Sequence, residues 1–237
     1  MRLANRASGP QFEAITLVML AGIFCLYAYA ACALILAPRH FAALMSEMGP
    51  LETMGTLACF VAAVLFFGAF GKTLASRNFG RAMWLFGLAL GTSFLVLEEI
   101  SWGQHIFGFE TPASIAALNV QHETNFHNFR GIHFQSHELG ILVLFAFFVV
   151  TPLLATHEQL ARLFEALKMP LVPLQISALF AFSYAGFEAF RVLYRLFPLQ
   201  PPVNYGELQE AAYELIILLF AVTLWRPQVQ LREAAPR

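Results

Sequence analysis

The sequence predicts an all-α polytopic membrane protein, a bundle of about six transmembrane helices, and three observations predict it. Of the 237 residues, 59% are apolar or aromatic and only 12% are charged, whereas a soluble domain carries about 25% charged residues. The mean hydropathy is +0.65. The apolar residues also fall in stretches of the length, about 20 residues, that crosses a bilayer as a helix. This composition excludes a typical cytosolic enzyme, a disordered chain and a protein with a basic nucleic-acid-binding face.

Six apolar stretches are expected to cross the membrane, forming one domain over residues 1–237. Arg2 and Arg6 precede the first stretch, as bases precede a signal peptide, but the stretch is too long and has no clear small-residue cleavage site. We therefore expect it to remain as a membrane anchor. The expected spans are residues 12–36, 51–70, 82–100, 137–156, 170–193 and 207–225.

The distribution of basic residues predicts the orientation of these spans. With the N-terminus in the cytoplasm, the cytoplasmic segments hold ten of the 14 Lys and Arg residues and the outer segments hold four, as the positive-inside rule requires. Both termini are then cytoplasmic, and the connections 37–50, 101–136 and 198–206 face outward. Residues 157–169 have one apolar face at helical spacing and are expected to form an amphipathic helix on the cytoplasmic surface.

The outward-facing loop 101–136 and the helix ends beside it carry most of the chemistry. Residues 98–138 include five of the seven histidines and are the only stretch dense in ionisable side chains. Within the loop, Thr111 as N-cap and Pro112 at the first helical position predict a short helix in the outer interface. This loop is longer and more polar than a connection between spans needs to be, so we expect it to contain the functional site.

Two adjacent glutamates, Glu98 and Glu99, end the third span. Neighbouring side chains on a helix point about 100° apart, so one is expected to face the bundle and the other the interface. A carboxylate inside a membrane span is a functional candidate by default. The alternative is that the carboxylate reaches the surface or pairs with an arginine for structural reasons alone.

Histidines and glutamates at helical spacing suggest a metal site. His133 and His137 are four residues apart, and so are Glu123 and His127. Side chains at this spacing share one face of a helix, and these four would suit Zn²⁺ or Fe²⁺ with a metal-bound water as nucleophile. The HExxH motif of zinc proteases is missing, and the alternative is that the histidines only pack and form hydrogen bonds. Transmembrane haem binding is not expected, because the histidines lie on one side of the membrane.

The segment EEISWGQHIFGFETP, followed by NVQHETNFHNF, resembles a signature of uncharacterised bacterial polytopic membrane proteins. That signature reads roughly EEISWGQRxxGxxTP and then NxQGETNxHN, and no established activity accompanies it. This chain departs from it at His105, where the signature has a base, and at His122, where it has glycine. The positions that match include Glu98, Glu99, Ser101, Trp102, Gly103, Gln104, Thr111, Pro112, Asn119, Gln121, Glu123, Thr124, Asn125, His127 and Asn128.

The resemblance favours some residues of this segment over others as candidates for catalysis. It implies that the catalytic residues are Glu98, Glu99, Glu123 and His127, in preference to the two histidines that depart from the signature. The many amide and hydroxyl side chains between them suggest a hydrogen-bonded pocket on the outer face, in which Gln104 and Asn125 are expected to bind substrate. The resemblance also implies a multi-pass protein of the bacterial inner (cytoplasmic) membrane.

Charges of both signs lie in the outer halves of the last two spans. Arg191 and Arg195 share a face of the fifth span with Glu188, and three glutamates spaced by three and four residues begin the sixth. The simplest interpretation is a set of structural Arg–Glu pairs between two antiparallel helices. In the functional alternative, Arg191 and Arg195 clamp an anionic headgroup and Glu214 joins them in substrate binding.

Three functions remain open from the sequence. The first is a metal-dependent hydrolase or transferase that acts on the head of a lipid-like substrate. The second is a non-catalytic accessory or ligand-binding subunit that docks a membrane-protein partner. The third is a small transporter, which is disfavoured because the inner halves of the spans have almost no ionisable residues. All three have the lipid bilayer as a partner, and none involves nucleic acid.

Overall fold

The computed structural model describes residues 10–46, 48–131 and 133–225, and this part of the chain forms helices and no strand. Six helical segments in it are long and apolar enough to cross a membrane, which confirms the predicted fold class. The chain is therefore a multi-pass helical membrane protein. The six segments are Phe12–Leu36, Pro50–Ala75, Phe79–Glu99, His137–Leu154, Leu174–Leu196 and Glu207–Trp225.

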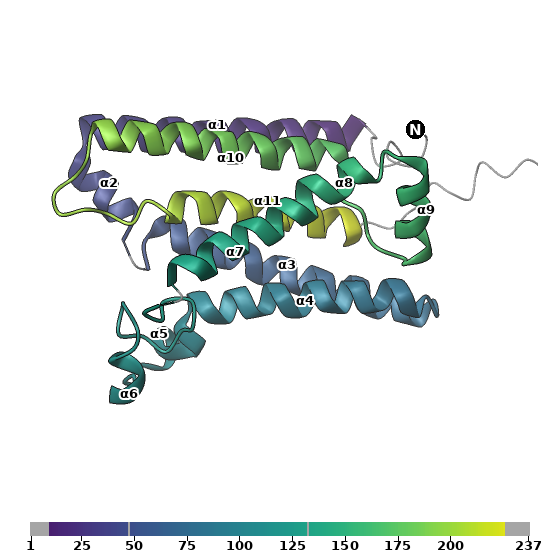
Figure 1. The fold of residues 1–237 in the computed structure, drawn as a ribbon, viewed down its shortest axis with the longest axis horizontal. Helices are drawn as coiled ribbons and strands as arrows, with labels where there is room; N and C mark the ends of the chain where they lie inside the picture. The colour runs from purple at the N-terminus through teal and green to yellow at the C-terminus, as the bar shows by residue number, and fades with distance from the viewer. Residues whose placement is uncertain (1–9, 47, 132, 226–237) are drawn as a thin grey trace, which may run out of the picture.

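The long helices form two groups that one helix joins (Figure 1). α1 (Pro10–Leu36) lies along α10 (Leu174–Leu196), and α3 (Pro50–Ala75) packs on both α4 (Phe79–Glu99) and α11 (Glu207–Trp225). α11 also packs against α10, so it connects the two groups. Buried side chains follow one another along most of α11, which makes it the central helix of the bundle.

Local sequence explains how α3 and α4 form an antiparallel pair. Pro50 occupies the first turn of α3, where its missing N–H has no helical partner to lose. Arg77, with φ of 59°, makes the tight turn at the other end of α3. The side-chain oxygen of Asn78 then accepts a hydrogen bond from the N–H of Arg81 at 3.3 Å and caps α4.

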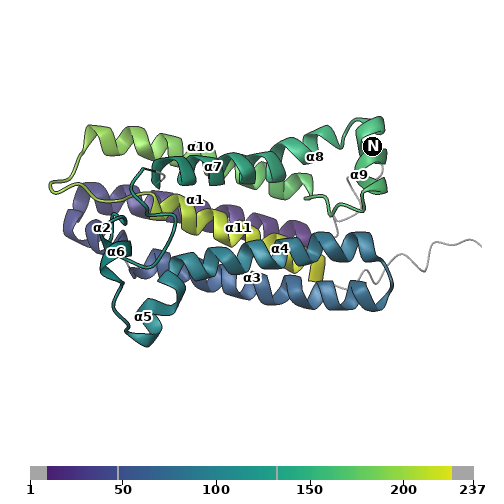
Figure 2. The same ribbon diagram turned by 60° about the horizontal axis from the view of Figure 1, so that its bottom comes forward.

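The fourth spanning segment is an irregular helix. α7 (His133–Phe145) continues into a π-helical turn, η2 (Ala146–Val150), and then into α8 (Thr151–Leu154). Pro152 has no N–H and its ring crowds the preceding turn, so the regular hydrogen-bond pattern cannot pass through it. η2 and α8 pack against α10, whereas α7 has its contacts mainly within its own segment. α7 therefore stands apart from α4, with α11 behind the two in Figure 2.

The remaining elements are short and lie at the two ends of the bundle. We call the end that holds loop 100–131 the loop end; it is on the left in Figure 1. α9 is at the opposite end and is the amphipathic helix that the sequence predicts over 157–169. The short elements are α2 (Pro38–Leu44), η1 (Ser101–Gly103), α5 (Gln104–Phe107), α6 (Ala113–Ala116) and α9 (Glu158–Ala166).

Candidate functional site

The chain reverses direction directly after α4 through three residues in the left-handed region. Ser101, Trp102 and Gly103 have φ values of 46°, 56° and 90°. Glycine adopts this region readily, but a residue with a side chain pays about 1–3 kcal/mol for it and keeps it only where its surroundings hold it. Here two glutamates hold the side chains of Ser101 and Trp102.

Glu98 is the first of these glutamates and the centre of the contacts that fix the loop. Its residue is 3% exposed. Its Oε2 accepts hydrogen bonds from the backbone N–H groups of Phe126 and His127 at 2.8 and 2.9 Å. Its Oε1 accepts one from the indole N–H of Trp102 at 2.6 Å. Glu98 therefore positions the loop backbone, a role that the sequence did not predict for it.

The ring of His127 is oriented by the same carboxylate. Its Nδ1 lies 3.2 Å from Oε2 of Glu98. Because a carboxylate only accepts, Nδ1 carries the hydrogen and the lone pair of the neutral ring is on Nε2. A base held by a third group in this way is a recurrent arrangement in enzymes. The structure thus brings together two of the predicted catalytic residues.

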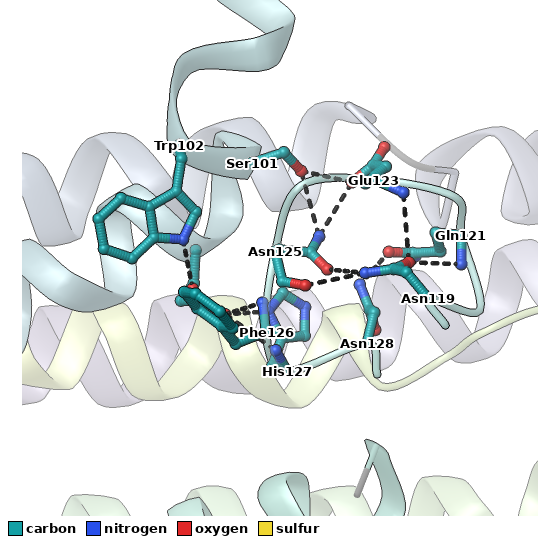
Figure 3. A network of polar contacts seen from close by, with 10 residues as sticks. Ser101, Trp102, Asn119, Gln121, Glu123, Asn125, Phe126, His127 and Asn128 are labelled. Atoms are coloured by element: carbon teal, nitrogen blue, oxygen red, sulfur yellow. Dashed lines mark hydrogen bonds and ion pairs between the residues drawn. The ribbon is translucent and has the colours of Figure 1, made fainter. Parts of the chain in front are cut away.

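Glu123 is held on the other side of the loop. Its Oε2 accepts hydrogen bonds from the Ser101 hydroxyl at 2.5 Å and from the Asn125 amide at 3.0 Å. The amide of Asn119 in turn donates to the side-chain oxygen of Asn125 at 2.8 Å. Both asparagines are buried, so Asn125 serves the structure of the loop. We call the bonded set the loop network: Glu98, Ser101, Trp102, Asn119, Gln121, Glu123, Asn125, Phe126, His127 and Asn128 (Figure 3).

Gln104 has a similar structural role at the edge of the loop. Its Oε1 accepts hydrogen bonds from the Thr111 hydroxyl at 3.0 Å and from the backbone and hydroxyl of Thr124 at 3.0 and 2.9 Å. The Thr111 hydroxyl is thereby used away from the helix that it was predicted to cap. That helix, α6, consequently has Pro112 as its N-cap and begins at Ala113, which corrects the predicted start.

A cavity of about 630 Å³ lies beneath the loop network, between α3, α4, α7 and α11. Its lining residues on α11 extend from Glu207 to Phe220, which is about 20 Å along a helix that rises 1.5 Å per residue. Most of the wall is apolar, and Phe66 and Phe148 lie at its depth with Phe220. Polar side chains line the part near the loop end. The cavity is thus divided between an apolar and a polar portion.

Seven of the 15 glutamates line this one cavity, and none of its described lining residues is Lys or Arg. Two of the seven belong to the loop network. Among the five that remain, Glu99 lies near the other four, which are Glu52, Glu207, Glu210 and Glu214. His137 places Nδ1 at 3.1 Å from Oε1 of Glu210. We call the five glutamates outside the loop network the carboxylate cluster: Glu52, Glu99, Glu207, Glu210 and Glu214.

The adjacent glutamates at the end of α4 divide between these two groups. Glu98 contacts the loop network, and Glu99 faces the carboxylates of α3 and α11. The sequence predicted that one of the two would face the interface, and this is wrong, because both line the cavity. The loop folds back over the end of α4 and covers the side that would otherwise face outward.

Glu214 fits closely against α3. It is 8% exposed, and a Cβ on Gly55 would lie 1.8 Å from its Oε2. A side chain at this position would require the Glu214 carboxylate to move. Cys59, one turn further along α3, also lies beside this carboxylate. The sequence of α3 thus makes room for an acidic group inside the bundle.

Gln209 carries an unpaired acceptor in the same cavity. The residue is 1% exposed, and its amide donates to the Tyr213 hydroxyl at 2.8 Å. Its Oε1 has no hydrogen bond of good geometry among the described residues, although the His137 ring interacts with the same side chain. Buried polar atoms are bonded in the large majority of cases, so each exception needs an explanation.

The cavity opens sideways between α4 and α7, at an opening that we call the portal. Phe94 on α4 and Leu139 and Val143 on α7 line the cavity, yet they are 47%, 60% and 57% exposed. A Cβ at Gly91 or Gly140, which also line the cavity, would meet nothing within 4 Å. In a membrane such an apolar opening faces the lipid chains.

Two predicted substrate-binding residues lie away from this cavity. Arg191 forms its ion pair with Glu188 of its own helix, at 2.8 Å. Neither Arg191 nor Arg195 is among the described residues that line the cavity, whereas Glu214 is. The glutamates of α11 turn toward α3 and α4 instead of toward these arginines, because α3 and α4 lie on the other side of α11 from α10.

The predicted metal ligands are divided between two partners. His127 contacts Glu98 and His137 contacts Glu210. The side chain of His133 lies outside the described part of the chain. Among the residues that the structure describes, no group of three or more His, Cys or Glu is arranged to hold a metal ion. The zinc or iron site therefore stays a prediction.

Sequence reasoning missed Glu52 and Gln209, and it assigned Glu207 and Glu210 to pairing with arginines. One signal was present: Glu207, Glu210 and Glu214 share a helical face that carries no base.

Comparisons of this chain with protein-family models, curated proteins and solved structures find no match. The functional interpretation therefore rests on the geometry described above.

Proposed function

We propose that this protein binds a lipid-like molecule, with the hydrocarbon part in the apolar portion of the cavity and the head beneath the loop network. The observation that carries the proposal is the division of one cavity of about 630 Å³ into an apolar wall and a polar end. An amphiphile has the same division, and its hydrocarbon part is stabilised wherever it leaves water. Pockets of roughly 300–1,000 Å³ bury most of a small ligand.

The portal supports entry from the bilayer. Its exposed side chains on α4 and α7 are apolar, so a hydrocarbon chain passes between them without crossing water. With the orientation that the basic residues predict, the loop end faces outward and the ligand comes from the outer leaflet. The irregular segment around η2 and α8 supports the same interpretation, since it is where α7 diverges from α10.

The experiment that tests this proposal blocks the portal. Gly91→Trp places an indole in the open space at the portal, whereas Gly22→Trp places one in equally open space on α1, away from the cavity. Both variants and the unaltered protein are purified in a neutral detergent, and the lipids that remain bound are quantified by mass spectrometry.

We expect the unaltered protein and Gly22→Trp to retain the same amphiphile in a fixed ratio to the protein. Gly91→Trp is expected to retain about tenfold less, the effect of losing about 1.4 kcal/mol of binding free energy. The proposal is overturned if no amphiphile co-purifies, or if the two tryptophan variants retain equal amounts.

A second function, catalysis at the head of the bound molecule, is favoured by the hydrogen bond between Glu98 and His127. Nε2 of His127 would take the proton of a water or hydroxyl group while its oxygen bonds to an acyl or phosphoryl centre of the head. The bond from that centre to the leaving oxygen then breaks, and the imidazolium returns the proton to that oxygen, which completes hydrolysis or group transfer. Glu123 and Glu99 line the same cavity and supply further carboxyl groups. The accessory and transport roles stay predictions.

Replacement of His127 separates catalysis from binding. We expect His127→Ala to slow conversion of the head about 10²- to 10⁴-fold, the usual contribution of a general base, while the amphiphile still binds. His157→Ala is the matched control, since His157 is exposed beside α9 at the opposite end of the bundle. Mass spectrometry of an outer-leaflet lipid extract incubated with each protein gives the rates. Equal rates for both variants would exclude His127 as the base.

A further inference from the structure

We propose that a turn of the loop, outside the six spanning segments, inserts into the lipid leaflet at the loop end of the bundle. We call it the apolar turn, and its residues are Ile106, Phe107, Gly108 and Phe109. The sequence predicts an interfacial helix only from Thr111 onward, so the apolar turn is an additional contact with the membrane. Its insertion does not depend on the molecule proposed for the cavity, because none of its four residues is among the described residues that line the cavity.

The apolar turn displays large apolar side chains on a fixed base. Ile106 and Phe107 are 65% and 79% exposed. Gln104, which begins α5 just before them, is held by hydrogen bonds from Thr111 and Thr124 to its side chain. The fold therefore holds the exposed pair in place instead of burying it. A contiguous apolar surface of this kind marks a contact with a membrane or with another protein.

A row of aromatic rings joins the exposed side of α4 to this part of the loop. The ring of Trp102 lies edge-on to that of Phe94 on α4, with the ring centroids 6.0 Å apart. The ring of Phe126 lies edge-on to that of Trp102 at 5.8 Å. All three residues are exposed, and Trp102 comes shortly before α5 in the chain. The row thus extends the lipid-facing surface of a spanning helix to the base of the apolar turn, as aromatic side chains do at the level of the headgroups. This continuity favours the bilayer over a protein as the partner.

The apolar turn lies beside the bundle instead of beyond its end. In both Figure 1 and Figure 2, α5 and α6 extend sideways from the end of α4, and α1 and α10 reach further along the long axis of the bundle than α5 does. The last residues of these two helices, Leu36 and Leu196, are apolar and exposed. Because spanning helices lie within a few tens of degrees of the bilayer normal, a bilayer that covers these two ends also surrounds α5.

The charge of this stretch identifies the part of the bilayer that receives it. Among residues 106–120, Glu110 is the only charged residue, and it is exposed directly after the apolar turn. Attraction to anionic headgroups requires basic residues, so the burial of apolar side chains is what drives insertion. The carboxylate of Glu110 stays at the polar surface and limits the depth of the turn. The partner is therefore the hydrocarbon of a leaflet, whatever the charge of its headgroups.

The experiment places a photoreactive side chain in the apolar turn and identifies what it reaches. Phe107 is replaced by p-benzoylphenylalanine in the full-length protein, which is illuminated in membranes of the expressing cells and in phosphatidylcholine nanodiscs. Mass spectrometry of the intact protein distinguishes an adduct with a lipid from one with a protein. Leu90, exposed midway along α4, is replaced in the same way as the lipid reference. Gln200 is the water reference, because it is exposed in the connection between α10 and α11, which reaches furthest at the loop end (Figure 1).

The expected result is a lipid adduct at position 107. Its yield should be similar to that of position 90 and about tenfold or more above that of position 200, because a probe in the hydrocarbon has acyl chains within reach. The yield should stay the same when the nanodiscs contain an anionic lipid, since no basic residue of the stretch 106–120 takes part.

A pair of substitutions tests the force that drives insertion. With the photoreactive side chain moved to position 106, Phe107→Glu is expected to lower the yield of lipid adduct about tenfold or more, the effect of losing the burial of one large apolar side chain. Phe107→Leu is the matched control, because it stays apolar and should keep the yield. Since Phe107 is exposed, neither substitution should change the melting temperature in detergent.

Insertion of the apolar turn is overturned if position 107 forms lipid adducts no better than position 200. It is also overturned if the adducts at position 107 are with a second copy of the chain or with another protein, or if Phe107→Glu and Phe107→Leu give equal yields. These results leave the lipid-like molecule in the cavity untouched, because Gly91→Trp tests that molecule separately.

Discussion

The loop network and the carboxylate cluster both contain glutamates that line the cavity, yet the groups around these glutamates differ. Glu98 accepts three hydrogen bonds from loop residues in addition to the contact with His127. Glu99, the next residue of α4, lies near four other carboxylates instead. Both regions line one cavity within the same bundle.

This difference distinguishes buried polar groups that stabilise the fold from those that are candidates for function. A buried carboxylate that receives several donors stabilises the backbone that supplies them, so its loss should cost stability. Acidic groups that gather beside one another in a cavity are candidates for function, because their proximity costs stability.

The largest expected effect comes from removing Glu98. Glu98→Ala leaves the N–H groups of Phe126 and His127 and the indole of Trp102 without their acceptor. We expect the free energy of unfolding to fall by about 3–5 kcal/mol, as for the loss of one partner in a buried charged network. Thermal denaturation in detergent measures this loss. Trypsin cleavage after Arg130, an exposed residue of the loop, should also become faster.

The control for this prediction is Glu110→Ala, which removes an exposed glutamate of the same loop. It should leave both the melting temperature and the cleavage rate after Arg130 unchanged. If Glu98→Ala behaved like this control, Glu98 would not stabilise the fold of the loop.

An intermediate effect is expected where the carboxylate cluster touches α3. Gly55→Ala places a Cβ against Oε2 of Glu214, and it also brings the Cβ within 3.2 Å of Ala211 Cα. We expect a loss of about 1–3 kcal/mol in the free energy of unfolding, typical of overpacking, because Glu214 is displaced.

Gly71→Ala serves as the matched variant, because a Cβ on Gly71 meets nothing within 4 Å on the same helix. It should be neutral or stabilising by up to about 1 kcal/mol, since alanine favours a helix over glycine. Similar melting temperatures for the two alanine variants would show that Glu214 does not need the space at Gly55.

The smallest expected effect is the change in stability when Gln209 is replaced, and its sign shows whether Gln209 stabilises the fold. Gln209→Leu removes a hydrogen bond to Tyr213 and also removes a buried acceptor that has no donor among the described residues. These two contributions nearly offset, so the ligand-free protein should be unchanged or more stable by about 1 kcal/mol. A stability loss of several kcal/mol would instead place Gln209 with the structural residues.

The helices were predictable from the sequence because length and hydropathy decide them locally. The spans 12–36 and 207–225 agree with the structure at both ends, and the other four differ by a few residues. The irregular segment at η2 follows from Pro152 but was not predicted. The start of α6 was predicted one position early, because Thr111 bonds to Gln104, a partner that adjacent residues do not reveal.

The candidate site was predictable only in part. Glu98, Glu99, Glu123, His127, His137 and Glu214 were singled out from the sequence, and all of them line the cavity. Their division between the loop network and the carboxylate cluster was not predictable, because it depends on which carboxylate meets the backbone of Phe126 and His127. Gln209 was missed because a glutamine near the start of an apolar helix looks like a surface residue.

The sequence by itself determined that this chain is a helical membrane protein with its polar residues gathered toward one end of the bundle, since these properties follow from composition and from the alternation of apolar and polar stretches. Only the tertiary structure decided which glutamates share a cavity, that Arg191 and Arg195 lie apart from it, and that α7 leaves a portal beside α4. The physical reason is that helix packing fixes the rotation and neighbours of each span, and these decide whether a buried carboxylate meets a donor, another carboxylate or an open space.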